Sequence, residues 1–132
     1  MSTFLPELQM GNRIIHFEVA GTDGPALESF YSKLFGWEID HQGQGDMQYG
    51  FVRDGSAGPI GGGIRHEPNG GPEVVFYVEV EDLEEAIRQV KALGGSVRIE
   101  PVNTGDVTFA MITDPQGNSV GLIQMPEDAS DE

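Results

Sequence analysis

The sequence predicts an α+β fold in which one unit, a strand followed by a helix and three further strands, occurs twice. The first observation is an internal repeat: residues 45–54 recur as residues 105–114, with small, aromatic and acidic residues at matching places. The second is that residues 63–68 recur in the same way as residues 121–126. The third is a change of hydrophobic period within each copy, from the alternation of a strand to the spacing of a helix. Two copies of one unit commonly pair and leave a cleft, so we expect function where they face each other.

The first copy opens with a half-buried strand over residues 13–20. Apolar and polar side chains alternate along it and therefore lie on opposite faces of a sheet. One face carries Ile15, Phe17 and Val19, and the other carries His16 and Glu18.

A helix over residues 26–35 follows, because Asp23 is a suitable N-cap and Gly36 a suitable left-handed C-cap. Its apolar stripe is Leu27, Phe30, Tyr31 and Leu34. Three strands then complete the copy, separated by glycine-rich turns. They are expected from residue 37, over residues 47–53 and over residues 60–65.

The second copy repeats this order after a short linker, residues 68–72. A strand over residues 74–80 leads to a helix over residues 83–93, which Asp82 caps. Strands are expected over residues 97–99, 107–112 and 119–124. We therefore expect a single domain over residues 1–132, with module one at about 11–67, module two at about 73–126 and an acidic tail at 127–132.

Composition excludes several classes of function. The chain has 132 residues, no cysteine and a formal net charge of −15. Thiolate metal sites and cysteine nucleophiles are therefore excluded, and a nucleic-acid partner is not expected because clustered lysine and arginine are lacking. No apolar run or signal pattern predicts a membrane segment, so a cytoplasmic location is expected. The acidic balance favours a cationic or neutral ligand.

Several motifs together resemble the vicinal oxygen chelate superfamily, which includes glyoxalase I, bleomycin-resistance proteins and extradiol dioxygenases. In module one they are His16-Phe17-Glu18-Val19 with Asp23, residues 30–37 and residues 61–64; in module two they are Tyr77-Val78-Glu79-Val80 with Asp82, Gly94-Gly95 and residues 114–118. The resemblance implies two βαβββ modules that form a cup-shaped mixed β-sheet with helices on the outside. It also implies a small organic ligand in the cup and a homodimer.

Metal-binding members of this superfamily take ligands from the first and last strand of each module. Matched residue by residue, those four positions here are His16, Gly63, Val75 and Gly121. A divalent ion needs nitrogen or oxygen donors, and His16 is the only matching one. We therefore expect no metal and no other cofactor, although a His16–Glu18–Glu79 cluster could in principle ligate an ion.

The candidate site residues follow from these strands. His16 and Glu18 share a face and are candidates for acid–base catalysis, because a carboxylate can orient an imidazole. The candidates for ligand binding are Tyr77, Glu79, Arg65, Gly63, Gly121, Trp37, Tyr49 and Phe51. The two glycines would leave space for a ligand near the floor of the cup. Aromatic residues in a small sheet protein more often form core than a ligand site, and the sequence leaves open which face of residues 47–51 lines the cup.

Three functions remain compatible with this pattern. The first is a small-molecule binding protein of the glyoxalase/bleomycin-resistance type that works without metal, which the four metal positions favour. The second is a metal-dependent lyase, isomerase or dioxygenase of the superfamily. The third is a metal-free acid–base enzyme that uses His16 and Glu18.

Overall fold

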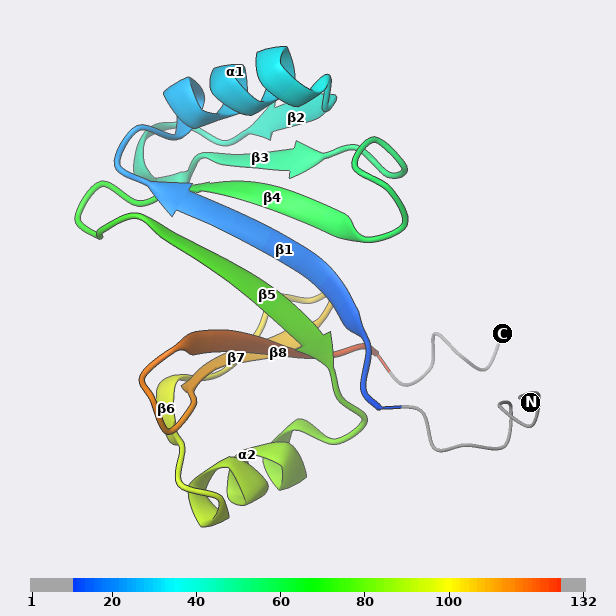
Figure 1. Ribbon diagram of the computed structural model, residues 1–132, viewed down its shortest axis with the longest axis vertical. Coiled ribbons are helices and arrows are strands. Elements are labelled where there is room, and N and C mark those ends of the chain that lie inside the picture. Colours follow the sequence, from blue (N-terminus) through cyan, green and yellow to red (C-terminus); the bar gives the residue numbers. More distant parts are fainter. Residues whose placement is uncertain (1–10, 127–132) are drawn as a thin grey trace.

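The computed structural model describes residues 11–126 and confirms the α+β class with two βαβββ modules (Figure 1). The acidic tail predicted at 127–132 lies outside the described residues. Module one comprises β1 (Ile14–Gly21), α1 (Gly24–Phe35), β2 (Ile39–Gln42), a short 3₁₀ turn η2 (Gly45–Met47), β3 (Tyr49–Val52) and β4 (Gly61–His66). Module two comprises β5 (Glu73–Glu79), α2 (Leu83–Ala92), β6 (Ser96–Asn103), β7 (Thr108–Thr113) and β8 (Ser119–Gln124).

The two modules join edge to edge in one mixed, eight-stranded sheet of order β2-β3-β4-β1-β5-β8-β7-β6. The first strand of each module pairs in parallel with the last strand of the same module, and β1 pairs antiparallel with β5. At that junction Phe17 pairs with Phe76, between the flanking pairs His16–Tyr77 and Glu18–Val75. The two modules therefore meet at equivalent residues, Phe17 and Phe76. The residues next to this pair are not equivalent, because His16 and Glu18 of β1 lie opposite Tyr77 and Val75 of β5.

Both helices begin and end where local chemistry dictates. Asp23 Oδ1 accepts a hydrogen bond of 3.0 Å from the backbone N–H of Ala26, and Gly36 ends α1 with φ of 75°. Asp82 Oδ1 accepts one of 3.1 Å from Glu85 at the start of α2. None of the helices in the described residues is long and apolar enough to cross a membrane.

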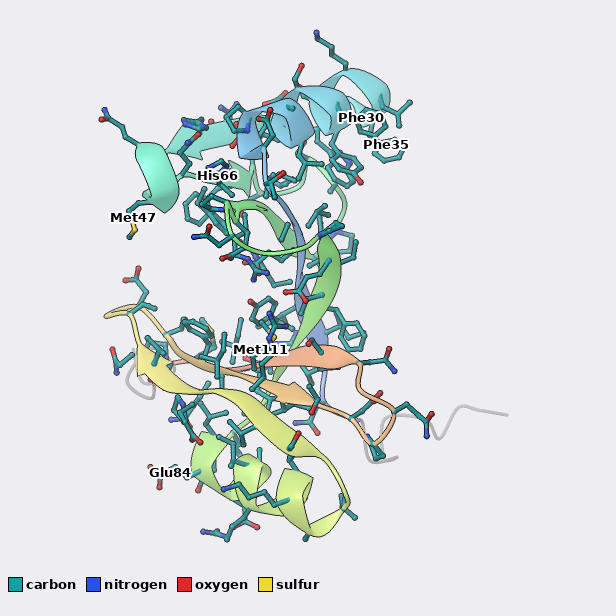
Figure 2. All side chains as sticks on the ribbon, turned by 90° about the vertical axis from the view of Figure 1, so that its left-hand side faces the viewer. Phe30, Phe35, Met47, His66, Glu84 and Met111 are labelled. Atoms are coloured by element: carbon teal, nitrogen blue, oxygen red, sulfur yellow. The ribbon has the colours of Figure 1, made fainter. Side chains whose placement is uncertain are left out.

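The helices cover the outer face of the sheet near its two ends (Figure 1). Beneath α2, the core is formed by Leu83, Ile87, Ala110, Ile112 and Leu122. On α1, Phe30 and Phe35 remain about half exposed, and their ring centroids lie 5.0 Å and 5.9 Å from that of Tyr31 (Figure 2). The opposite, concave face of the sheet is left free of helices and carries the candidate site.

The homodimer stays a prediction.

Candidate functional site

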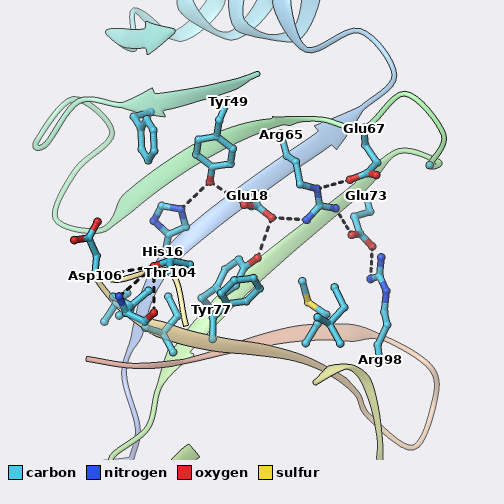
Figure 3. A pocket seen from close by; sticks show the side chains of 18 of the residues that line it. His16, Glu18, Tyr49, Arg65, Glu67, Glu73, Tyr77, Arg98, Thr104 and Asp106 are labelled. Atoms are coloured by element: carbon cyan, nitrogen blue, oxygen red, sulfur yellow. Dashed lines mark hydrogen bonds and ion pairs between the residues drawn. The ribbon is translucent and has the colours of Figure 1, made fainter. Parts of the chain in front are cut away.

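The concave face of the sheet encloses a cavity of about 1010 Å³ between the two modules (Figure 3). Strands β1, β3, β4, β5, β6, β7 and β8 contribute to its wall, together with the linker after β4 and the turn between β6 and β7. Its apolar lining is Ile15, Phe51, Ile99, Val107, Phe109, Met111, Ile123 and Met125, and its polar lining includes His16, Glu18, Tyr49, Arg65 and Tyr77. A mainly apolar wall with a few convergent polar groups is typical of a small-molecule site.

The Glu18 carboxylate is the centre of the polar wall, although only 7% of the residue is exposed. Oε1 accepts hydrogen bonds from Arg65 Nη1 at 2.6 Å and from Tyr77 OH at 3.0 Å. Oε2 accepts one from Tyr49 OH at 2.8 Å. A buried carboxylate is stable only when it is paired and hydrogen-bonded, and these three donors meet that requirement.

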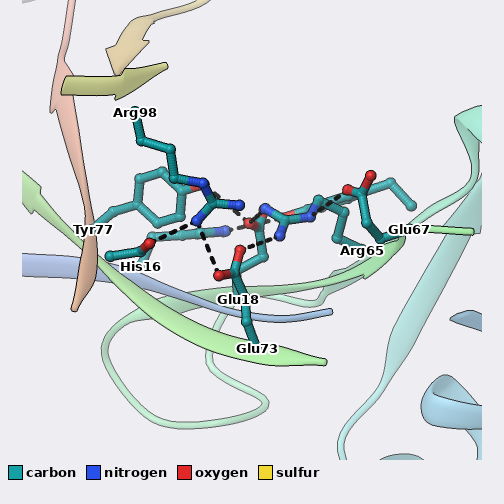
Figure 4. Close-up of polar contacts among 9 residues, drawn as sticks. His16, Glu18, Arg65, Glu67, Glu73, Tyr77 and Arg98 are labelled. Atoms are coloured by element: carbon teal, nitrogen blue, oxygen red, sulfur yellow. Dashed lines mark hydrogen bonds and ion pairs between the residues drawn. The ribbon is translucent and has the colours of Figure 1, made fainter. Parts of the chain in front are cut away.

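Arg65 connects this centre to a second carboxylate and a second arginine (Figure 4). Its Nη2 donates to Glu73 Oε2 at 2.5 Å, and Glu73 Oε1 in turn accepts from Arg98 Nη1 at 3.0 Å. Arg65 Nε lies 3.1 Å from Glu67 Oε1, which is an ion pair by distance, but the geometry does not make it a hydrogen bond. The chain of alternating charges therefore runs from module one, through Glu73 on β5, to β6 of module two.

Burial and neighbouring charges shift the pKa values of the groups in this cluster. Burial raises the pKa of the Tyr49 and Tyr77 hydroxyls, and the nearby carboxylate raises it further, so both stay protonated and act as donors. Burial lowers the pKa of His16, an effect that the Glu18 charge partly opposes, and the imidazole is neutral at pH 7. For Glu73, burial acts to raise the pKa, but the hydrogen bonds from Arg98 and Arg65 outweigh it and the pKa is lowered.

His16 Nε2 lies 3.3 Å from Tyr49 OH. The tyrosine proton is directed to Glu18, so the hydroxyl oxygen is the acceptor for His16, and we assign the Nε2–H tautomer on this basis. The imidazole, the tyrosine and the carboxylate thus form one directed chain of hydrogen bonds. On its other side His16 borders a smaller cavity of about 310 Å³, which is also lined by Asp40, Phe51 and Arg53.

Gly63 and Gly121 give space to the two tyrosine rings. A Cβ placed on Gly63 would overlap the Tyr49 ring and hydroxyl, and one on Gly121 would overlap the Tyr77 ring. We expected these glycines to leave room for a ligand, but neither lines the cavity, and the rings occupy the space above them.

Comparisons with known proteins identify the family. Residues 13–122 match the model of the Glyoxalase/Bleomycin resistance protein/Dioxygenase superfamily. The chain belongs to this superfamily.

A sequence relative and two solved structures illustrate the similarity. CFP32 of Mycobacterium tuberculosis, which is named as a glyoxylase, is 33% identical over 112 residues; the match covers 78% of this chain but only 42% of that protein. The hypothetical protein BH1468 of Bacillus halodurans has a similar structure, with a TM-score of 0.68 at 16% identity, covering 89% of this chain and 97% of that one. Methylmalonyl-CoA epimerase of M. tuberculosis gives a TM-score of 0.62 at 16% identity, with 96% and 98% covered. At these identities, the two structures support the fold alone.

The residues at the superfamily's metal positions do not fit a divalent ion. The structure brings His16, Gly63, Val75 and Gly121 to the central strands β1, β4, β5 and β8, as the repeat predicts. Only His16 has a donor atom, and the tyrosine rings cover the two glycines. Among the side chains that the structure describes, no group of three or more His, Cys, Asp or Glu is placed to hold a metal.

Not every predicted site residue reaches the cavity. Tyr77, Arg65, Tyr49 and Phe51 line it with His16 and Glu18, so the Tyr49–Phe51 face of β3 faces the cup. Trp37 instead packs in an aromatic cluster, with ring centroids 5.2 Å from Phe17 and 5.5 Å from Tyr31. Glu79 pairs with Arg13 at 2.8 Å and lies outside the lining.

Sequence reasoning missed four charged residues that line the cavity: Glu67, Glu73, Arg98 and Asp106. Glu73 could have been found, because alternation along β5 places it on the same face as Val75 and Tyr77. Arg98 and Asp106 carried no such signal. Strand β6 runs to Asn103, four residues past its predicted end, and its register with β7 shifts twice.

Proposed function

We propose that this chain binds a small organic molecule in the cavity between its two modules and does so without a metal ion. The observation that carries this proposal is that the Tyr49 ring lies over Gly63 and the Tyr77 ring lies over Gly121. Two of the four metal positions lack a side chain, and tyrosine rings fill the space that ligands to a metal would need. The volume and apolar lining of the cavity support a ligand of ordinary metabolite or drug size.

The Glu18 cluster supports binding over acid–base catalysis. A general base must take a proton from the substrate, which a buried carboxylate paired with a guanidinium group does poorly. The Glu18 carboxylate already accepts three hydrogen bonds, one of them from a guanidinium group. Such a group positions the tyrosine hydroxyls well and abstracts a proton poorly.

Metal-free acid–base chemistry by His16 is the second candidate, because the imidazole is neutral and borders both cavities. Replacing His16 by Gln separates the two: a binding role alters affinity, whereas a catalytic role abolishes turnover while binding persists.

A thermal-shift screen of small organic molecules tests the main proposal, with each compound measured in EDTA and again with added zinc, manganese or nickel. A ligand at 100 times its Kd should stabilise the fold by about 2.7 kcal/mol. We expect at least one compound to raise Tm equally in EDTA and in metal. Stoichiometric binding of a divalent ion that is required for the ligand effect would refute metal independence.

A matched pair of variants tests whether the ligand binds in this cavity. Val107→Trp fills the cavity, whereas Val102→Trp adds the same bulk on the same hairpin at a position outside the lining. The ligand-induced rise in Tm should be lost in the first variant and kept in the second. An equal response in both variants would place the ligand elsewhere.

A further inference from the structure

Most hydrogen-bond donors that face the cavity are already engaged within the described part of the chain. Tyr49 and Tyr77 donate to Glu18, Arg65 donates to Glu18 and Glu73, and His16 donates to Tyr49. Arg65 Nε makes no hydrogen bond but is buried, and Arg98 keeps a side chain that is 40% exposed although Nη1 bonds to Glu73 and Ser119. The hydrogen-bonding capacity left for a ligand is therefore mainly that of acceptors.

The charges that line the cavity agree with this inventory. Four carboxylates face two guanidinium groups, which leaves an excess of two negative charges; the carboxylates are Glu18, Glu67, Glu73 and Asp106. Both arginines are already paired with glutamates. An anionic ligand would thus meet arginines that are more than neutralised, whereas a cationic ligand would reduce the excess charge.

Among the lining carboxylates, Asp106 takes no part in the cluster of Glu18, Arg65, Glu73 and Arg98. Figure 3 shows it at one side of the cavity, well separated from Arg65, Glu73 and Arg98 at the other. None of the described residues pairs with its carboxylate or donates a hydrogen bond to it. The turn that carries it is fixed by Thr104, whose Oγ1 accepts from the backbone N–H groups of Asp106 at 3.3 Å and Val107 at 3.2 Å.

Aromatic and apolar side chains complete the wall in which Asp106 stands. Tyr49 and Phe51 form a ring pair with centroids 4.6 Å apart, and Val107 and Phe109 follow Asp106 along the chain. Aromatic faces attract an organic cation, and a carboxylate in the same cavity adds charge and direction.

We infer that the ligand is an organic cation. Its ammonium or similar group pairs with Asp106, and its apolar or aromatic body packs against Phe51, Phe109 and Met111. This inference rests on the proposed function and names the class of its ligand. The Arg65–Glu73–Arg98 chain then serves to hold the two modules together around the ligand and not to bind an anion.

Three probes with one aromatic body and different charge test it: 2-(1-naphthyl)ethylamine, 1-naphthylacetamide and 1-naphthylacetate. Their Kd values are measured by calorimetry, and ¹³C-methyl NMR of Met111 and Met125, which line the cavity, reports occupancy whatever the charge. We expect the amine to perturb these methyl signals and to bind at least about tenfold more tightly than the acetamide, with the acetate weakest. Asp106→Asn should weaken the amine about fivefold to tenfold and leave the acetamide unchanged.

Glu100→Gln is the matched control, because it removes the same charge from the same hairpin at an exposed position outside the cavity lining. It should change the affinity for the amine less than twofold. Methyl shifts from the acetate as large as those from the amine, or an amine affinity unaffected by Asp106→Asn, would overturn the inference and leave the proposed binding function standing. Failure of all three probes to shift either methionine would count against the binding function itself.

Discussion

The ring of Tyr77 lies over Gly121, so closely that a Cβ on the glycine would overlap the ring atoms. The same relation holds between Tyr49 and Gly63 in the other module. Two tyrosines from non-equivalent strands, β5 and β3, thereby direct their hydroxyls to one carboxylate, Glu18. The two glycines occupy matching positions in the two modules, whereas the two tyrosines come from strands that do not correspond. The hydrogen-bonded centre at Glu18 is therefore asymmetric.

Replacing Gly121 by Ala should destabilise the fold by about 2 kcal/mol or more, because the new Cβ would overlap the Tyr77 ring, and displacing the ring would disturb its hydrogen bond to Glu18. Urea unfolding measures the change. Gly71→Ala is the control: its Cβ would meet nothing within 4 Å, so the free energy of unfolding should stay within about 1 kcal/mol of wild type. In a double-mutant cycle with Tyr77→Ala, the two losses should be less than additive. Full additivity would show that the glycine and the ring are not coupled.

Glu18→Gln should cost about 3 kcal/mol of stability, because it leaves Arg65 without its buried partner and offers the tyrosines a weaker acceptor. Chemical denaturation at pH 7 provides the measurement. Glu38→Gln breaks an ion pair to Arg53 in which both side chains are more than half exposed, and should have a much smaller effect. Equal unfolding midpoints for Glu18→Gln and wild type would mean that the cluster contributes nothing to the fold.

The repeat in the sequence predicted the βαβββ order and the pairing of His16 with Glu18 on one face, because strand alternation and helix caps are local properties. It also predicted that Gly63 and Gly121 occupy matching places in the last strand of each module. What fills the space above those glycines depends on contacts between strands, such as Tyr49 of β3 beside Gly63 of β4, and no local pattern encodes them. Trp37 shows the same limit, since its aromatic neighbours come from β1 and α1 and decide that it packs there and not in the cup. Asp106 was missed because its place in the cavity depends on the lengthened hairpin between β6 and β7.

Alkaline titration should reveal the two protected tyrosines. The pKa of Tyr49 and of Tyr77 is raised in the folded protein above the value of about 10 in the unfolded chain. The resulting stability is complete below about pH 10 and is lost as the pH rises from there toward the folded-state pKa, since only the unfolded chain releases these protons. The free energy of unfolding should therefore fall more steeply above pH 10 in wild type than in Tyr49→Phe.

Absorbance at 295 nm provides an independent check of the same effect. Tyr49→Phe should leave the absorbance rise between about pH 9.5 and 10.5 unchanged, because the hydroxyl that it removes does not ionise there in the folded protein. Loss of a full tyrosine's signal in that range would show that the Tyr49 hydroxyl is not protected by the Glu18 centre.

His16 should make the protein less stable in mild acid. Burial lowers its pKa below the value of about 6.5 in the unfolded chain, so in that window the unfolded state binds the proton and the folded state does not. The contribution to stability is complete above about pH 6.5 and is lost as the pH falls through the folded-state pKa. The free energy of unfolding, measured in urea at pH 8, 7, 6 and 5, should therefore fall less between pH 7 and 5 in His16→Gln than in wild type. His41→Gln is the matched control, because that histidine pairs with Glu28 outside the cup and its loss leaves His16 in place. If His16→Gln follows the wild-type curve over this range, burial does not lower the pKa of His16 in the folded protein.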